Sequence, residues 1–192
     1  MSRIGLIRHG STEWNLLGRA QGHSDIPLNE KGLDQAGRLA ARLAQEKWDL
    51  VVSSDLQRAQ QTAHAVAEAL GIPEVILDPR LREMHGGQIE GTTEEERIAK
   101  WGENWRDQEL GIEQPEALIE RGTACMEDYI TQYPDHAILF VSHGAILGHC
   151  IRTLIPDEDT RAKLENTSLT ILERNQAGWH CERYNCALHL TD

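Results

Sequence analysis

The sequence predicts an α/β fold: a mostly parallel sheet covered by helices, with a β-rich end. Two observations carry this prediction. Short apolar runs, such as residues 4–7 and 137–142, alternate with longer segments whose apolar residues recur at helical spacing. Near the C-terminus, two alternating segments flank a turn at residues 175–178, which is typical of an edge hairpin. Strands that alternate with helices form a parallel sheet with helices on its faces.

Length and charge restrict the class of protein. A chain of 192 residues is long enough for one sizeable core, so we predict a single domain over residues 1–192. No apolar run approaches a membrane span and no leader pattern opens the chain, so we expect a cytoplasmic protein with no membrane partner. The net charge of -12 argues against a nucleic-acid partner, because backbone binding needs a broad basic surface. A monomer and a homodimer both remain open.

The first half of the chain is predicted to hold three strands and two helices. The strands lie at about residues 4–8, 48–53 and 75–77. Asn29 is the expected N-cap of a helix that runs to about residue 45, with Leu33 on its apolar face. Ser54 or Asp55 is expected to cap the second helix, which ends at Gly71.

The second half begins with a glycine-dense loop at residues 81–91. A helical excursion is then predicted at about residues 92–114, over the functional site, with Trp101 and Trp105 in one aromatic stripe. We favour the interpretation that both tryptophans fix this excursion to the body; the alternative places one on the lip of a pocket. Pro115 can open a helix to about Tyr133, and the apolar strand 137–142 precedes a helix halted by Pro156.

Four residues are predicted to meet at one edge of the sheet. These residues, each at or just beyond the carboxyl end of a predicted strand, are Arg8, His9, Arg58 and His143. Open α/β sheets bind ligands along this edge. Two guanidinium groups and two imidazoles suit a dianion, most naturally a phosphoryl group. Glu83, on the glycine-dense loop, can reach the same edge.

The chemistry of this set is metal-free phosphoryl transfer. A neutral histidine is a usable nucleophile near neutral pH, and a protonated carboxyl group can give its proton to a leaving oxygen. Four scattered cysteines without a CxxC pair indicate free thiols, and His143 and His149 are spaced wrongly for a shared metal on one helix face. We therefore expect no metal and no cofactor.

The motifs also carry a family resemblance. Residues 6–15 resemble the Arg-His-Gly signature of the histidine phosphatase superfamily, which has the phosphoglycerate-mutase-like fold. Residues 18–28, 53–63, 81–91 and 141–144 are similar to later blocks, and residues 166–190 resemble the end of the family's small bacterial phosphatases. The resemblance covers essentially the whole chain. It implies a three-layer α/β/α sandwich with a mostly parallel mixed sheet, and a phosphoric monoester hydrolase.

The resemblance also implies a role for each site residue. His9 would be the nucleophile that becomes phosphohistidine, and Glu83 the proton donor to the leaving group. The residues that hold the phosphoryl oxygens would be Arg8, Arg58 and His143. The residues that additionally line the substrate site would be Asn15, Gln21 and Gly22.

Three functions are weighed for this site. The favoured one is a metal-independent phosphomonoesterase acting on a small phosphorylated substrate; the alternatives are a phosphoglycerate mutase with the same site and an inactive phospho-ligand binding module. The moderate excursion and the phosphatase-like tail favour hydrolysis. Broad specificity, phosphoserine, phosphoglycerate and α-ribazole phosphate all remain open as substrates, as does the role of His85. The histidines taken as surface or packing residues are His23, His64, His136, His149 and His180.

Overall fold

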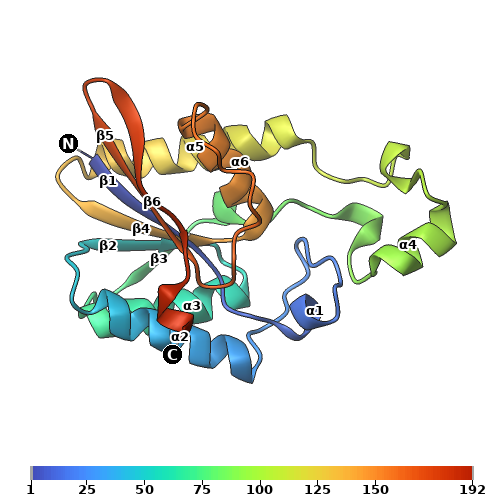
Figure 1. Cartoon of the computed structure of the whole chain (residues 1–192), viewed down its shortest axis with the longest axis horizontal. Helices are drawn as coiled ribbons and strands as arrows, with labels where there is room; N and C mark the ends of the chain where they lie inside the picture. Colours follow the sequence, from blue (N-terminus) through green and yellow to red (C-terminus); the bar gives the residue numbers. More distant parts are fainter. Residues whose placement is uncertain (1, 192) are drawn as a thin grey trace.

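The computed structural model describes residues 2–191 as a mixed six-stranded sheet with helices on both faces (Figure 1). The strands are β1 (Ser2–Arg8), β2 (Leu50–Ser53), β3 (Val75–Leu77), β4 (Ala137–Ser142), β5 (Leu169–Asn175) and β6 (Gly178–Cys186). Their order across the sheet is β3-β2-β4-β1-β5-β6. The first four are parallel, whereas β5 runs antiparallel to β1 and β6 antiparallel to β5. The mostly parallel sheet and the edge hairpin are confirmed.

The helices give the predicted three layers. They are α1 (Glu13–Leu16), α2 (Glu30–Leu43), α3 (Gln57–Leu70), α4 (Glu94–Trp101), α5 (Pro115–Gln132) and α6 (Gly144–Leu154). Short 3-10 turns are η1 (Pro79–Leu81), η2 (Gly87–Ile89), η3 (Trp105–Asp107) and η4 (Leu188–Leu190). Figure 1 shows α5 and α6 on one face of the sheet and α2 and α3 on the other. None of the helices within residues 2–191 is long and apolar enough to cross a membrane.

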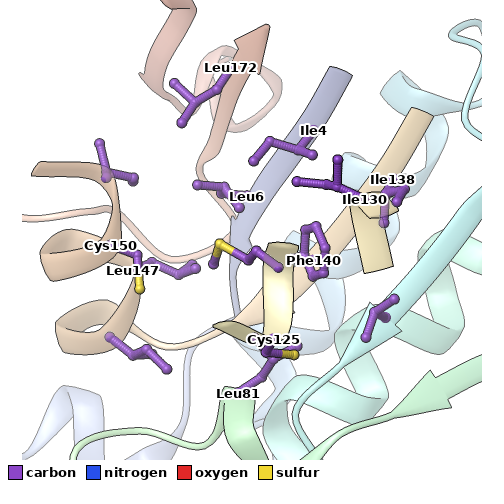
Figure 2. Close-up of a cluster of buried hydrophobic side chains, with 14 of the residues drawn as sticks. Ile4, Leu6, Leu81, Cys125, Ile130, Ile138, Phe140, Leu147, Cys150 and Leu172 are labelled. Carbon is purple, nitrogen blue, oxygen red and sulfur yellow. The ribbon is translucent and has the colours of Figure 1, made fainter. Parts of the chain in front are cut away.

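Two cores hold the layers together, one on each face of the sheet. Successive residues of β4 point to opposite faces: Phe140 packs in the core under α5 and α6, whereas Leu139 packs against α2 and α3. Figure 2 shows the first core, in which Phe140 lies near Ile4, with the buried residues Cys125 of α5 and Cys150 of α6 in the same cluster. Because central strands are buried on both sides, their sequences read as continuous apolar runs.

Two details of the helices differ from the sequence prediction. The N-cap of α3 is Leu56, and Ser54 instead accepts the Leu56 N–H in the preceding turn at 3.3 Å. Leu33 is 52 % exposed, because the buried face of α2 is centred on Ala36 and Leu39, about a quarter turn away. The caps at Asn29 and Gly71 lie where predicted.

The excursion between the glycine-dense loop and α5 is less helical than predicted. Helix α4 ends at Gly102, whose φ of 84° stops it, so Trp101 and Trp105 do not share one helical stripe. Trp105 is buried against Ile89 and Leu110, and Trp101 packs against the same cluster, which joins the excursion to the glycine-dense loop. That both tryptophans fix the excursion to the body stays a prediction. Figure 1 shows α4 beyond α1, at the end of the molecule away from the hairpin.

Candidate active site

The parallel strands bring the predicted residues to one edge of the sheet. Arg8 ends β1 opposite Ser142 of β4, so His9 and His143 both follow directly after paired strands. Their ring centroids are 5.1 Å apart. Arg58 enters from the first turn of α3, which follows β2 on the other side of β4. The predicted meeting of these four side chains is confirmed.

His9 is buried as a neutral imidazole with one free nitrogen. Its Nδ1 lies 2.7 Å from the Gly10 carbonyl oxygen, which can only accept, so Nδ1 carries the proton. The pKa of His9 lies well below its ordinary value because burial, and then the charges of Arg58 and Arg8, disfavour the imidazolium. The lone pair of Nε2 is therefore available at neutral pH.

His143 has the opposite tautomer. Arg58 Nε donates to His143 Nδ1 at 3.2 Å, and a guanidinium cannot accept, so the proton of His143 is on Nε2. That N–H donates to Ser54 Oγ at 2.8 Å. Burial and then the Arg58 charge hold the pKa of His143 well below its ordinary value. The two imidazoles are thus a lone-pair donor and an N–H donor, side by side.

Arg58 is fully buried and connects α3 to the loop before α2. Its Nη1 donates to the Ser24 carbonyl and its Nη2 to the Gly22 carbonyl, both at 2.8 Å. Burial lowers the pKa of Arg58 to about 10, so it remains a cation at neutral pH. Gly22 has a φ of +51°, and a Cβ there would collide with Glu90. Glycine is therefore required where this loop passes under the site.

Arg8 joins the site to the segment that follows α6. Its Nη1 donates to the Leu164 carbonyl at 2.5 Å, and burial lowers its pKa. Its Nε is buried and has no hydrogen-bond partner among the described residues. A Cβ on Gly144 would stand 3.3 Å from that nitrogen, so the glycine leaves room for the guanidinium over the start of α6.

Glu83 sits against the amino end of α6. Its Oε2 accepts the Ala145 N–H at 3.1 Å, and its Oε1 accepts the N–H groups of Ile146 at 3.1 Å and Met84 at 2.9 Å. The first N–H groups of a helix have no intrahelical partner and suit a carboxylate. Glu83 and Arg8 line one cavity of about 290 Å³, so the predicted proton donor lies near one of the predicted phosphoryl-binding residues.

The remaining predicted site residues form a rim around Thr12. Asn15 is the partner of Thr12 in a capping box, and Gln21 Oε1 accepts the Thr12 hydroxyl at 2.9 Å. Asn166 Nδ2 donates to the His9 carbonyl at 2.9 Å and lies 3.4 Å from Asn15 Oδ1. These contacts place Asn15 and Gln21 next to the turn at His9 and Gly10; their contact with substrate stays a prediction.

Arg121 supports the Glu83 loop and was not found from the sequence. Its Nη1 donates to the carbonyls of Arg80 and Arg82 at 2.7 Å, and its Nη2 to that of Glu83 at 2.9 Å. Glu113 pairs with the same guanidinium through both of its oxygens. An arginine in the middle of an amphipathic helix carries no sequence signal for this role.

His23, predicted as a surface or packing histidine, is partly buried and packs against the glycine-dense loop. Its Nε2 donates to the Glu83 carbonyl at 2.8 Å, and its ring stands edge-on to His85 at 4.9 Å. Glu90 accepts the His23 N–H at 2.8 Å and the Gly86 N–H at 2.9 Å, and so closes the loop from below. No sequence pattern indicates this contact of His23, because it depends on the path of the loop.

Comparisons with known proteins agree with this geometry. The family model of the histidine phosphatase superfamily (branch 1) matches residues 4–187. The chain is 34 % identical to an uncharacterized phosphatase, PhoE, of Bacillus subtilis (100 % of this chain, 98 % of the relative). It is 37 % identical to a probable phosphoglycerate mutase, GpmB, of Serratia proteamaculans (93 % and 88 %).

A solved structure is similar over nearly the whole chain. This is phosphoserine phosphatase from Entamoeba histolytica in complex with 3-phosphoglyceric acid, at a TM-score of 0.83 and 32 % identity, over 99 % of this chain and 100 % of that one. The resemblance expected from the sequence is therefore confirmed, together with the phosphoglycerate-mutase-like fold. The chain belongs to the histidine phosphatase superfamily and is an enzyme of the phosphatase type.

Proposed function

We propose that the protein is a metal-independent phosphomonoesterase that hydrolyses small phosphorylated metabolites through a phosphohistidine at His9. The observation that supports this most directly is the state of His9: neutral, buried, and held by Gly10 so that Nε2 keeps its lone pair. A nucleophile of this kind beside Arg8 and Arg58 suits attack on a phosphoryl dianion.

The reaction has two steps. In the first, the phosphoryl oxygens are held by Arg8, Arg58 and His143, whose Nε2–H turns from Ser54 Oγ to the phosphoryl group, while His9 Nε2 bonds to phosphorus. The bond from phosphorus to the ester oxygen breaks, and Glu83 gives its proton to that oxygen. In the second step Glu83 takes a proton from water, the water oxygen bonds to phosphorus, and the bond to His9 breaks.

The experiment is release of inorganic phosphate from a panel of phosphomonoesters by wild type and His9→Ala. We expect turnover by wild type in the absence of added metal and a loss of at least a thousandfold in His9→Ala, because the covalent route is removed. Equal rates in both proteins would contradict the proposal. Addition of a chelator to the wild-type assay tests metal independence separately.

A phosphoglycerate mutase is the second candidate, because one relative at 37 % identity carries that name. The same phosphohistidine would then return its phosphoryl group to the substrate instead of to water. A mutase assay primed with bisphosphoglycerate separates the two candidates. Mutase turnover that exceeds phosphate release would favour the second candidate.

A further inference from the structure

A basic cavity extends from the phosphoryl pocket along α6. Its volume is about 290 Å³, near the small end of metabolite sites. Arg8 and Glu83 line it, so it shares two residues with the proposed site. Its outer wall carries three further cations, Arg152, Arg161 and Lys163. None of these three is used by the proposed reaction.

Small residues on α6 line the cavity and leave room for the side chain of Arg152 to lie along it. Gly144, Ala145 and Gly148 line the cavity. A Cβ on Gly148 would stand 3.4 Å from Arg152 Nη1, so the guanidinium lies back over the glycine, one turn nearer to the catalytic end of the helix. Arg152 therefore presents its charge along the cavity.

The opposite wall, residues 161–164, is held in place by the edge strand β6. Tyr184 Oη donates to the carbonyls of Thr160 and Ala162 at 2.8 and 2.9 Å. Asn185 Nδ2 donates to the Lys163 carbonyl at 3.1 Å, and Asn185 Oδ1 accepts the N–H of residue 165. Because Arg8 also binds the Leu164 carbonyl, this wall is fixed directly to the phosphoryl pocket.

The charges in the cavity are mostly uncompensated. Glu83 is the only carboxylate among its lining residues, and its oxygens accept backbone N–H groups of α6. Glu165, next to the lining residues, is close enough for its charge to raise the pKa of Arg8. Arg161 pairs with Asp159 at 3.0 Å, but both side chains are largely exposed. Within residues 2–191, Arg152 and Lys163 belong to no ion pair. In a chain with a net charge of -12, this is a local field of the opposite sign.

We propose that this cavity binds a second anionic group of the substrate, so that the enzyme prefers phosphomonoesters that carry a carboxylate or a second phosphate. This inference rests on the proposed function for the catalytic step. The phosphoryl group that reacts lies at His9, and the second anion lies between Arg152 and Lys163. Guanidinium and ammonium donors recognise both kinds of anion.

Two pairs of substrates test the proposal. In the first pair, 3-phosphoglycerate differs from glycerol 3-phosphate by a carboxylate in place of a hydroxymethyl group. In the second, propanediol bisphosphate differs from hydroxypropyl phosphate by a second phosphate. We expect wild type to prefer the more anionic member of at least one pair by about tenfold in kcat/KM. The pair that shows the preference identifies the anion.

The variants are Arg152→Ala and Lys163→Ala, with Lys47→Ala as the matched control. Lys47 is 90 % exposed and precedes β2, at the amino edge of the sheet and away from the cavity. We expect each of the first two variants to lower the preference at least threefold while kcat/KM for the less anionic member changes less than twofold. If both variants keep the wild-type preference, or if wild type shows no preference for the more anionic substrate, the proposal is overturned.

A binding measurement separates this proposal from the proposed function. Calorimetry with His9→Ala measures the affinity for 3-phosphoglycerate and glycerol 3-phosphate without turnover. We expect tighter binding of the carboxylate, and loss of the difference in the double variant His9→Ala/Arg152→Ala. If this result is obtained but wild type releases no phosphate, the hydrolytic function is wrong and the anion site stands. If phosphate is released but both ligands bind equally, only the anion site is wrong.

Discussion

Arg58 Nε and His143 Nδ1 are joined by a hydrogen bond of 3.2 Å, and this contact determines which nitrogen of His143 holds its proton. The bond runs in one direction, because a guanidinium has no acceptor. His9 is oriented the other way by the Gly10 carbonyl. Two neighbouring imidazoles therefore carry different tautomers, and both are neutral because burial lowers their pKa values.

The first prediction concerns these tautomers. Nitrogen NMR of the free enzyme at pH 7 should give a protonated Nδ1 for His9 and a protonated Nε2 for His143. Both rings should remain neutral below pH 6.5, since their pKa values are lowered. His64, which is exposed, serves as a reference ring in the same spectra. A proton on Nε2 of His9 in the free enzyme would contradict the assignment of the nucleophile.

The second prediction is a loss of stability below pH 6.5. A histidine whose folded pKa is lowered stays neutral in the fold, whereas the unfolded chain takes up a proton below about 6.5. The free energy of unfolding then falls as pH falls from 6.5 towards the folded pKa, by up to about 1.4 kcal/mol per pH unit for each such residue. His9 and His143 both contribute with this sign.

Urea denaturation between pH 5 and 8 measures this loss. Other histidines add to it, since burial also lowers the pKa of His189 to about 4. The comparison with His9→Gln isolates one contribution: the slope below pH 6.5 should decrease by about 1.4 kcal/mol per pH unit. Parallel curves for the two proteins would mean that His9 is protonated in the fold.

The third prediction concerns Glu83. Glu83→Gln should lose most rate on esters with poor leaving groups and much less on an activated aryl phosphate, because an acid matters most when the leaving oxygen is basic. We expect a loss of about a hundredfold or more on an alkyl phosphate and less than tenfold on the aryl ester. The measurement is kcat/KM for both esters. Equal losses on the two would argue against a proton-donor role.

The site residues that can be predicted from the sequence are those that directly follow a strand. Arg8, His9 and His143 lie directly after apolar runs, so a parallel sheet brings them to one edge without further information. Arg58 was found because an arginine in the first turn of a helix opposes the helix dipole. In the structure Arg58 is buried and bonds to His143, which accounts for an arginine in the first turn of α3.

The parts that could not be predicted depend on loops and on contacts between distant elements. His23 reaches Glu83 only because the loop before α2 folds under the glycine-dense loop, through Glu90. Arg121 lies in the middle of α5, and its contacts with three carbonyls follow from the packing of that helix against η1. The aromatic stripe failed because Gly102 ends α4 between the two tryptophans.

The fourth prediction concerns Arg121, a positioning residue. Arg121→Ala removes the donors to the Arg82 and Glu83 carbonyls and leaves Glu113 half-buried without its cation. We expect kcat to fall about tenfold on a poor leaving group with little change in KM, since the phosphoryl pocket is untouched. The loss should be smaller on an activated aryl phosphate, as for Glu83→Gln.

Arg174→Ala is the control for Arg121→Ala. Arg174 also pairs with a glutamate of α5, Glu127, but on the exposed side by the hairpin. The Arg174→Ala substitution should leave kcat unchanged and lower the free energy of unfolding by at most about 1 kcal/mol. If the two variants lose activity and stability in the same proportion, Arg121 acts on the fold as a whole and does not position Glu83.

The fifth prediction concerns the close approach of two backbones below the catalytic turn. A Cβ on Gly10 would stand 2.6 Å from the Gly32 carbonyl oxygen, and a backbone atom cannot move aside as a side chain can. Gly10→Ala should therefore cost about 1–3 kcal/mol of stability. It should also displace the Gly10 carbonyl that orients His9, so kcat should fall more than tenfold.

Gly37→Ala is the control: it adds the same methyl group but should raise the stability of the protein instead of lowering it. Gly37 lies in the interior of α2 with nothing within 4 Å of the added carbon. Alanine there removes freedom from the unfolded chain and should stabilise the protein by about 0.5–1 kcal/mol, with kcat unchanged. Urea denaturation and phosphate release measure both variants. Gly10→Ala with full activity would mean that the His9 tautomer is not set by the turn at Gly10.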